Sequence, residues 1–183
     1  MSVEKLLASS KAFEGRRVNL RVDTIETPSG RETTREIVEF PNCVAIVAID
    51  ANENAILVRQ YRTAVGMVLL EIPAGKIEDD EQPLQAAHRE LREETGYTAL
   101  SMEELGGFYA GPGYSTEYLH LYLATNLEPT DETPDIDEIM NVFSVPLADI
   151  TALIAKGDIC DAKSVAGFLR VLTERGFGRD SKA

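Results

Sequence analysis

The sequence has few cysteines and lacks any long apolar run. Its 183 residues include only Cys43 and Cys160. Without a CxxC pair or further partners, these argue against a zinc site or a disulfide framework and favour buried thiols. No stretch approaches the roughly 20 apolar residues that span a bilayer, and the first residues lack the apolar segment of a signal peptide. We therefore expect a cytoplasmic protein with no membrane partner.

Basic residues are also scarce. The chain has 18 Lys+Arg against 31 Asp+Glu, a formal net charge of −13. This balance argues against binding to nucleic acid or to an anionic membrane, because both need a basic surface. It would also repel a phosphorylated substrate, so any phosphate chemistry here implies bound cations.

The length and the usual globular composition suit one domain with a small appended element. We expect residues 1–40 to form an N-terminal helix and a β-hairpin over 17–40, too small to be stable alone, and residues 41–183 to form the main domain. Strands that alternate with few helices predict an α/β or α+β fold, a mixed sheet between helices. The expected strands of the main domain are 43–49, 55–61, 68–72, 104–109, 118–125 and 138–145, and the expected helices are 79–95, 147–155 and 162–175.

The helix expected over 79–95 carries an unusual row of acidic residues. Glu90, Glu93 and Glu94 stand at i, i+3 and i+4, so they share one sector of the helix, beside an apolar stripe. Each like-charge pair costs about 0.2–0.5 kcal/mol, and the helix dipole adds a penalty near the C-terminus. A divalent cation would make this arrangement favourable. The alternative is a solvated acidic face. The stripe expected to face the core consists of Leu84, Ala87 and Leu91.

The residues around this helix follow a longer pattern. From Gly75 to Tyr97 the chain is G, five residues, E, seven residues, R-E-L-x-E-E-x-G-Y. This resembles the Nudix box at every fixed position. The resemblance implies a Nudix fold and a hydrolase that cuts a phosphoanhydride bond with the help of Mg²⁺, or possibly Mn²⁺, ions.

The resemblance also implies roles for single residues. Glu90, Glu93 and Glu94, with the backbone carbonyl of Ala74, would bind metal. Arg89 and Glu81 would orient the helix and its carboxylates through an ion pair. We count Glu93, Arg89 and Glu81 as candidate catalytic residues.

Other segments resemble the ADP-ribose and nucleoside diphosphate sugar pyrophosphatases of this family. Pro112 lies sixteen residues after Gly96, since 112 − 96 = 16, although an ordinary Gly-Pro-Gly turn needs no ligand. The resemblance implies that Glu117 contacts substrate and that Arg62 contacts the diphosphate, whereas Arg59 would only face solvent. The implied reaction splits ADP-ribose or another such sugar, for example GDP-mannose, into a nucleoside monophosphate and a sugar phosphate.

Three further assignments are less specific. Glu71 is a possible additional metal ligand or a structural carboxylate, and residues 161–164 fit the same subfamily, although their plainest role is a helix N-cap. The resemblance implies a general base in the acidic stretch 131–138, where Glu138 is the first choice and Asp137 or Asp135 the reserve. A solvated acidic loop is the alternative.

The subfamily forms homodimers that exchange an N-terminal hairpin, and residues 17–40 fit that element. The hairpin could instead simply extend its own sheet. Two other functions remain open: hydrolysis of nucleoside triphosphates or dinucleoside polyphosphates, and nucleotide sensing by a non-catalytic Nudix module, which usually lacks box glutamates that this sequence keeps.

Overall fold

The computed structural model describes residues 3–130 and 141–176. Contacts between Cα atoms divide the chain into two units. The first consists of Met1–Asn42 and Tyr109–Tyr118, and the second of Cys43–Phe108 and Leu119–Ala183.

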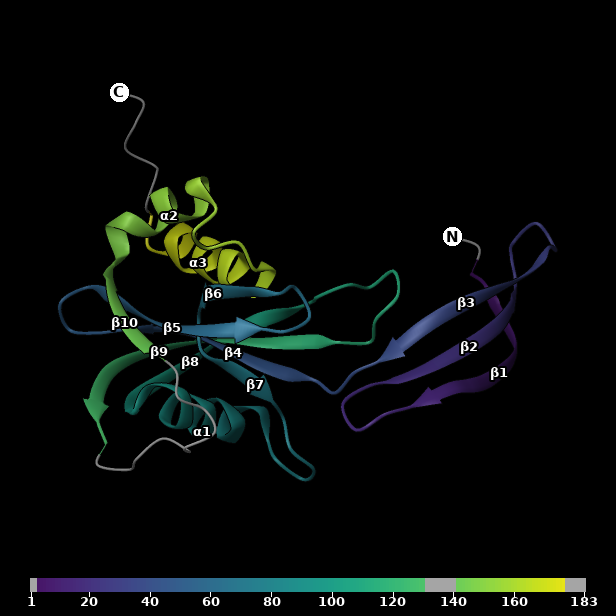
Figure 1. Cartoon of the computed structure of the whole chain (residues 1–183), viewed down its shortest axis with the longest axis horizontal. Helices are drawn as coiled ribbons and strands as arrows, with labels where there is room; N and C mark the ends of the chain where they lie inside the picture. Colours follow the sequence, from purple (N-terminus) through teal and green to yellow (C-terminus); the bar gives the residue numbers. More distant parts are fainter. Residues whose placement is uncertain (1–2, 131–140, 177–183) are drawn as a thin grey trace. The chain divides into compact units, whose positions relative to one another are not determined.

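The first unit contains a three-stranded antiparallel sheet in the order β1-β2-β3 (Figure 1). Strands β2 (Asn19–Glu26) and β3 (Glu32–Glu39) form the expected hairpin, with Gly30 in the turn at φ 80°. The helix expected within residues 1–40 is wrong, because Lys5–Glu14 form strand β1, which pairs with β2 along its length. Pairing with a neighbouring strand outweighs the weak local helix preference of this segment.

The segment that carries Pro112 also joins this sheet. The Val38 N–H donates to the Tyr114 carbonyl at 2.7 Å, and the Thr116 N–H donates to the Val38 carbonyl at 3.0 Å. The Thr116 hydroxyl accepts a hydrogen bond from the Phe40 N–H. These bonds hold a distant loop against the end of β3, a pairing that the sequence did not predict.

The second unit contains the mixed sheet that the sequence predicted. Strand β4 pairs in parallel with β9 and antiparallel with β5 and β7, while β5 also pairs with β6 and β10. The main path runs β10-β5-β4-β9-β8. The strands are β4 (Cys43–Ile49), β5 (Asn54–Arg62), β6 (Met67–Glu71), β7 (Ala74–Lys76), β8 (Tyr97–Tyr109), β9 (Tyr118–Pro129) and β10 (Asn141–Pro146).

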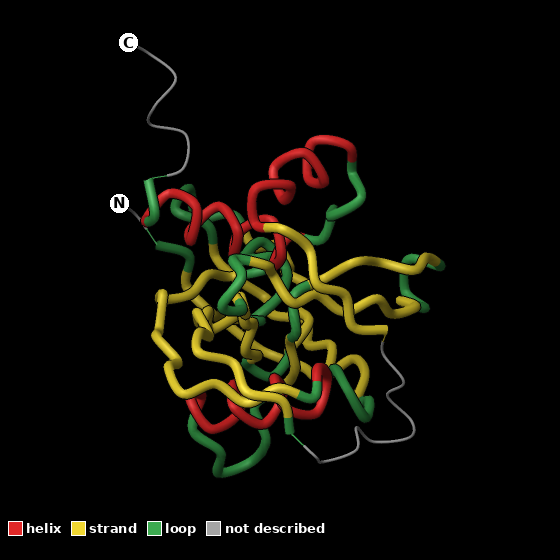
Figure 2. The backbone as a smooth tube through the Cα atoms, turned by 90° about the vertical axis from the view of Figure 1, so that its left-hand side faces the viewer, coloured by secondary structure: helices red, strands yellow, loops and turns green. Residues whose placement is uncertain are grey.

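Helices cover both faces of this sheet (Figures 1 and 2). Helix α1 (Pro83–Thr95) lies on one face, and α2 (Ile150–Lys156) and α3 (Ala162–Glu174) lie on the other. A short 3₁₀ turn, η2 (Leu147–Asp149), precedes α2. Within residues 3–130 and 141–176, no helix has the length and apolar character needed to cross a membrane.

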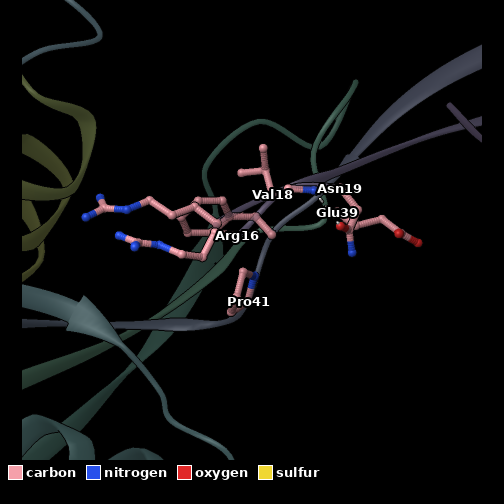
Figure 3. A pocket seen from close by; sticks show the side chains of 8 residues that line it. Arg16, Val18, Asn19, Glu39 and Pro41 are labelled. Atoms are coloured by element: carbon pink, nitrogen blue, oxygen red, sulfur yellow. Dashed lines mark hydrogen bonds between the residues drawn. The ribbon is translucent and has the colours of Figure 1, made fainter. Parts of the chain in front are cut away.

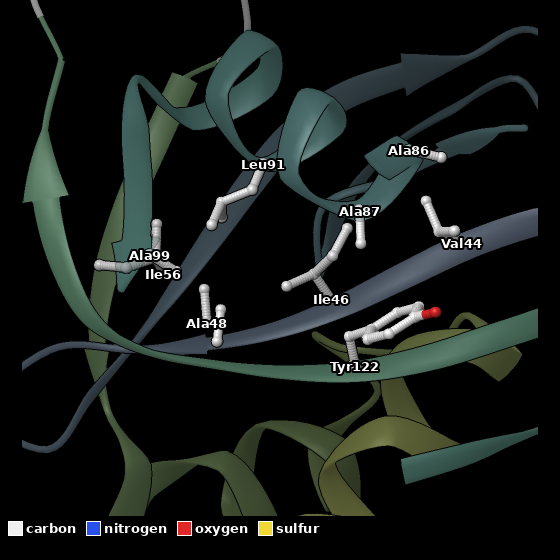
Figure 4. Close-up of a cluster of buried hydrophobic side chains, with 10 residues drawn as sticks. Val44, Ile46, Ala48, Ile56, Ala86, Ala87, Leu91, Ala99 and Tyr122 are labelled. Atoms are coloured by element: carbon white, nitrogen blue, oxygen red, sulfur yellow. The ribbon is translucent and has the colours of Figure 1, made fainter. Parts of the chain in front are cut away.

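Strand β4 forms the centre of the core, and all its residues are buried. Val44, Ile46 and Ala48 point toward α1, where they pack with Leu91 (Figure 4). On the opposite face α3 approaches closely, since a Cβ at Gly167 would lie 2.9 Å from the Val47 side chain. A strand covered on both faces reads as a continuous apolar run, which explains its sequence.

Several local expectations need correction. Helix α1 begins at Pro83 rather than at residue 79, because proline suits the first helical position. Strand β8 begins at Tyr97, seven residues before the expected start of 104, and β7 was not expected at all. Both cysteines lie in the described part of the chain and form no disulfide there. Cys43 is buried as expected, but Cys160 is exposed.

Candidate functional site

The short strand β7 and helix α1 meet at a close contact. The pairing of β7 with β4 places Gly75 opposite Val44, beneath the side chain of Glu90. A Cβ at Gly75 would lie 2.0 Å from the carboxyl carbon of Glu90. The Ala74 N–H donates to Oε2 of Glu94 at 2.9 Å. Two carboxylates of the helix therefore lie against this corner of the chain.

These two carboxylates belong to the buried face of α1. Glu90 is 8% exposed and Glu94 5% exposed, whereas the Glu93 side chain is 37% exposed. The expected separation of an acidic face from an apolar stripe is therefore wrong. Because the buried face includes the two glutamates with Leu91, its centre is turned away from Leu84, which is 46% exposed in the first helical turn.

Arg89 holds this group of carboxylates together. Its Nε and Nη2 donate to the two oxygens of Glu81 at 2.8 Å each, the expected ion pair. Its Nη1 also donates to Glu90 at 2.7 Å and to Glu93 at 3.0 Å. These bonds, first the one to Glu81, raise the pKa of Arg89, and Arg89 in turn lowers the pKa of Glu81. One guanidinium thus orients three carboxylates, two of which are candidate metal ligands.

The donor atoms at this corner suit a hard divalent cation. Carboxylate and carbonyl oxygens are the ligands that Mg²⁺ and Mn²⁺ prefer. Buried carboxylates also need a positive partner, since burial of an uncompensated charge is costly. In the described ranges, no group of three or more His, Cys, Asp or Glu side chains is already gathered as a metal cage. The residues therefore fit a metal chemically, but their side chains would have to converge to bind it.

A second charged cluster surrounds Glu71 at the end of β6. Arg62 donates from Nε to Oε1 at 3.0 Å and from Nη2 to Oε2 at 2.6 Å, and Lys163 of α3 donates to the same Oε2. Burial alone would raise the pKa of Glu71, but these two cations outweigh it and lower the pKa. Both oxygens of Glu71 are thus engaged by side chains of the protein. The expectation that Arg59 only faces solvent is incomplete, because its guanidinium lies 4.3 Å from the centre of the Phe143 ring.

Sequence reasoning missed the part that Lys163 plays here. The segment 161–164 does cap α3, as expected, because Asp161 accepts a hydrogen bond from the Ser164 N–H at 3.1 Å. The signal available was a lysine in the first turn of a helix, where the dipole disfavours a cation. Such a lysine needs an acidic partner, but the sequence could not identify Glu71.

Pro112 and Glu117 belong to the first unit. Pro112 lies in a turn closed by the Ser115 N–H, which donates to the Gly111 carbonyl at 2.8 Å. The backbone N–H of Glu117 donates to the Ser115 hydroxyl at 3.2 Å. The base candidates Glu138, Asp137 and Asp135 lie outside the described residues.

The first unit also contains a pocket of about 360 Å³. Arg16, Arg17 and Val18 line it before β2, and Glu39 and Pro41 line it at the end of β3 (Figure 3). The guanidinium of Arg16 and the carboxylate of Glu39 point in different directions in this view. The sequence analysis did not single out this arginine pair, although two adjacent cations in an acidic chain were a visible signal.

Comparisons with known proteins agree with this geometry. A family model described as "NUDIX domain" matches residues 39–168. An "ADP-ribose pyrophosphatase" of Bacillus subtilis (strain 168) is 38% identical over 163 residues, which cover 88% of each chain. A "Methanol dehydrogenase activator" of Bacillus methanolicus is 39% identical and covers 88% of this chain and 89% of its own. A solved structure titled "Crystal structure of ADP compounds hydrolase" matches with a TM-score of 0.86 and 26% identity, covering 96% of both chains. Because the box, the fold and these matches agree, the chain belongs to the Nudix hydrolase family, whose members generally need divalent metal ions.

Proposed function

We propose that this protein hydrolyses the pyrophosphate bond of ADP-ribose or another nucleoside diphosphate sugar in a Mg²⁺-dependent reaction. The products would be a nucleoside monophosphate and a sugar phosphate. The observation that carries the proposal is the pair of buried carboxylates, Glu90 and Glu94, set against the Ala74–Gly75 corner. Two buried anions at one corner are costly unless a cation joins them.

In this proposal, Glu90, Glu93 and Glu94 would hold Mg²⁺ with the carbonyl of Ala74. The metal would neutralise the charge that builds on the diphosphate and lower the pKa of the attacking water. Arg89, held by Glu81, would keep the carboxylates oriented, a role that typically changes metal affinity or activity by about 10- to 100-fold.

Substrate binding would involve residues of both units. Arg62 would bind the diphosphate, because a guanidinium fits phosphate oxygens with paired hydrogen bonds. Pro112 would shape the loop from which Glu117 contacts substrate. Glu138 remains our proposed general base. The names of the B. subtilis relative and of the solved structure support ADP-ribose over triphosphates or dinucleoside polyphosphates.

We further propose a homodimer that exchanges the N-terminal hairpin. All residues of β1 are exposed, including Leu6, Leu7 and Phe13, and a thin sheet with exposed apolar side chains commonly marks an interface. The pocket beside Arg16 and Arg17 would then contribute to nucleotide binding. We also propose the cytoplasm as the location, a reducing compartment that would keep both cysteine thiols reduced.

A substrate panel tests the proposed reaction directly. Purified protein would be assayed with ADP-ribose, GDP-mannose, UDP-glucose, ATP and a dinucleoside polyphosphate, with products separated by chromatography. We expect AMP and ribose 5-phosphate from ADP-ribose, loss of turnover in EDTA, and recovery when Mg²⁺ is restored. Preferred release of pyrophosphate or orthophosphate from ATP would favour the triphosphatase alternative. Nucleotide binding without any turnover would favour the non-catalytic module.

A further inference from the structure

Glu71 is a buried charge with two cationic partners. It is 1% exposed, and both its oxygens accept hydrogen bonds from Arg62. Lys163 adds a third charged contact at Oε2. One carboxylate can neutralise one cation, so the second cation leaves the trio of side chains with a net positive charge.

Lys163 reaches Glu71 because the start of α3 is fixed to the segment after β6. The buried hydroxyl of Ser164 accepts a hydrogen bond from the Ile72 N–H at 2.9 Å, across 92 residues of sequence. Asp161 caps α3 and also accepts a hydrogen bond from Lys163 at 2.9 Å. The ammonium group is therefore held in place by its backbone and by two carboxylates.

Arg62 is the member of the trio that can reach a ligand. Its side chain is 39% exposed, while that of Lys163 is 14% exposed. Arg62 also interacts electrostatically with Glu94, one of the candidate metal ligands, after its stronger interaction with Glu71. The exposed guanidinium is thus close enough to the carboxylate corner to sense its charge.

We propose that Lys163 is a positioning residue for diphosphate binding, which acts by compensating the charge of Glu71. This inference rests on the proposed function, in which Arg62 binds the diphosphate. With Lys163 present, Glu71 fixes the guanidinium in place without cancelling its charge. Without Lys163, the bidentate pair of Arg62 and Glu71 would be neutral overall and would attract a diphosphate only weakly.

The charge balance of the site makes this compensation important. Four carboxylates of the box, Glu81, Glu90, Glu93 and Glu94, face a polyanionic substrate, and Arg89 contacts three of them. The protein as a whole carries a net charge of −13. Loss of one positive charge beside the diphosphate should therefore weaken ground-state binding more than it slows the chemical step.

The test measures kcat and KM for ADP-ribose in Lys163→Met, Lys163→Arg and Arg62→Met variants and in the Arg62→Met/Lys163→Met double variant. Lys156→Met is the matched control, because Lys156 is an exposed lysine at the end of α2. We expect Lys163→Met to raise KM by about tenfold, the effect of a charged hydrogen bond, with a smaller change in kcat. Lys163→Arg should restore most of the affinity.

The double variant separates this role from a structural one. If Lys163 acts through Arg62, then Lys163→Met should add less than about a twofold increase in KM once Arg62 is absent. Equal effects in both backgrounds, an unchanged KM, or failure of Lys163→Arg to rescue would each overturn the inference. ADP-ribose affinity would also be measured by calorimetry in EDTA, where no turnover is expected. A wild type that binds ADP-ribose without hydrolysing it would refute the proposed reaction, while the same set of variants would still decide the role of Lys163.

Discussion

The substitution Gly75→Ala should abolish most activity while leaving the protein folded. The added methyl group would lie 2.0 Å from the carboxyl carbon of Glu90 and 2.0 and 2.2 Å from its two oxygens. Favourable contacts between carbon atoms need about 3.5–4.0 Å. The carboxylate would therefore have to move by roughly 1.5 Å or more, away from the position in which Arg89 holds it.

The expected loss follows from that displacement. A misplacement of about 1 Å in a catalytic arrangement can cost about 100-fold in rate, so we expect kcat/KM for ADP-ribose to fall by at least that factor. The clash involves the end of a flexible side chain, and no left-handed backbone is required at Gly75. Alanine also reduces the entropy of the unfolded chain, worth about 0.4–1 kcal/mol. The free energy of unfolding should thus change by no more than about 1 kcal/mol.

Gly157→Ala is the opposite control. Gly157 ends α2 at φ 83°, and a Cβ there would meet no atom within 4 Å. Alanine in this left-handed conformation should cost roughly 1–2 kcal/mol of stability with little effect on turnover. Both variants would be compared by steady-state kinetics in Mg²⁺ and by urea unfolding. A folded Gly75→Ala enzyme with near-native kcat/KM would refute the idea that the position of the Glu90 carboxylate matters.

Three further variants test the metal corner and its supports. Glu94→Gln should lower kcat by orders of magnitude without unfolding the protein, because it weakens charge neutralisation in the transition state; near-native turnover in Mg²⁺ would contradict this role. Ser164→Ala removes the acceptor for the buried Ile72 N–H and should cost about 1–3 kcal/mol in urea unfolding, whereas Ser101→Ala, at an exposed position, should cost little. Burial opposes but does not prevent the lowered pKa of Glu71, whose cationic partners dominate. Its stabilisation is therefore present above the unfolded pKa of about 4.3 and is lost as the pH falls through the lower folded pKa, so Glu71→Gln should flatten the acid side of the stability profile.

Local patterns in the sequence predicted most of the elements of the second unit. The apolar run of β4 and the proline and glycine at the ends of α1 are signals that lie within a few residues of the structure they produce. The spacing of the box likewise predicted the ion pair of Arg89 and Glu81, eight residues apart. Periodicity could not reveal that Glu90 and Glu94 are buried, because burial depends on what the helix packs against.

Long-range pairing explains the other errors. The N-terminal segment looked locally compatible with a helix, but β1 is stabilised by its partner β2. The bond between Phe40 and Thr116 joins residues 76 positions apart, and no spacing rule relates two such segments. Cys160 was expected to be buried on its chemistry alone, although it lies in an exposed connection before α3.

The candidate site therefore combines a local set of ligands with supports from distant parts of the chain. The box supplies the carboxylates, but the corner that they face is held by the pairing of β7 with β4 and, through Ile72 and Ser164, by α3. The final helix lies outside the box, yet it also supplies the cation that compensates Glu71. It follows that an isolated segment carrying the complete box would keep the ligands without their positions. The motif identifies the chemistry, and the remainder of the sheet and α3 are needed to place it.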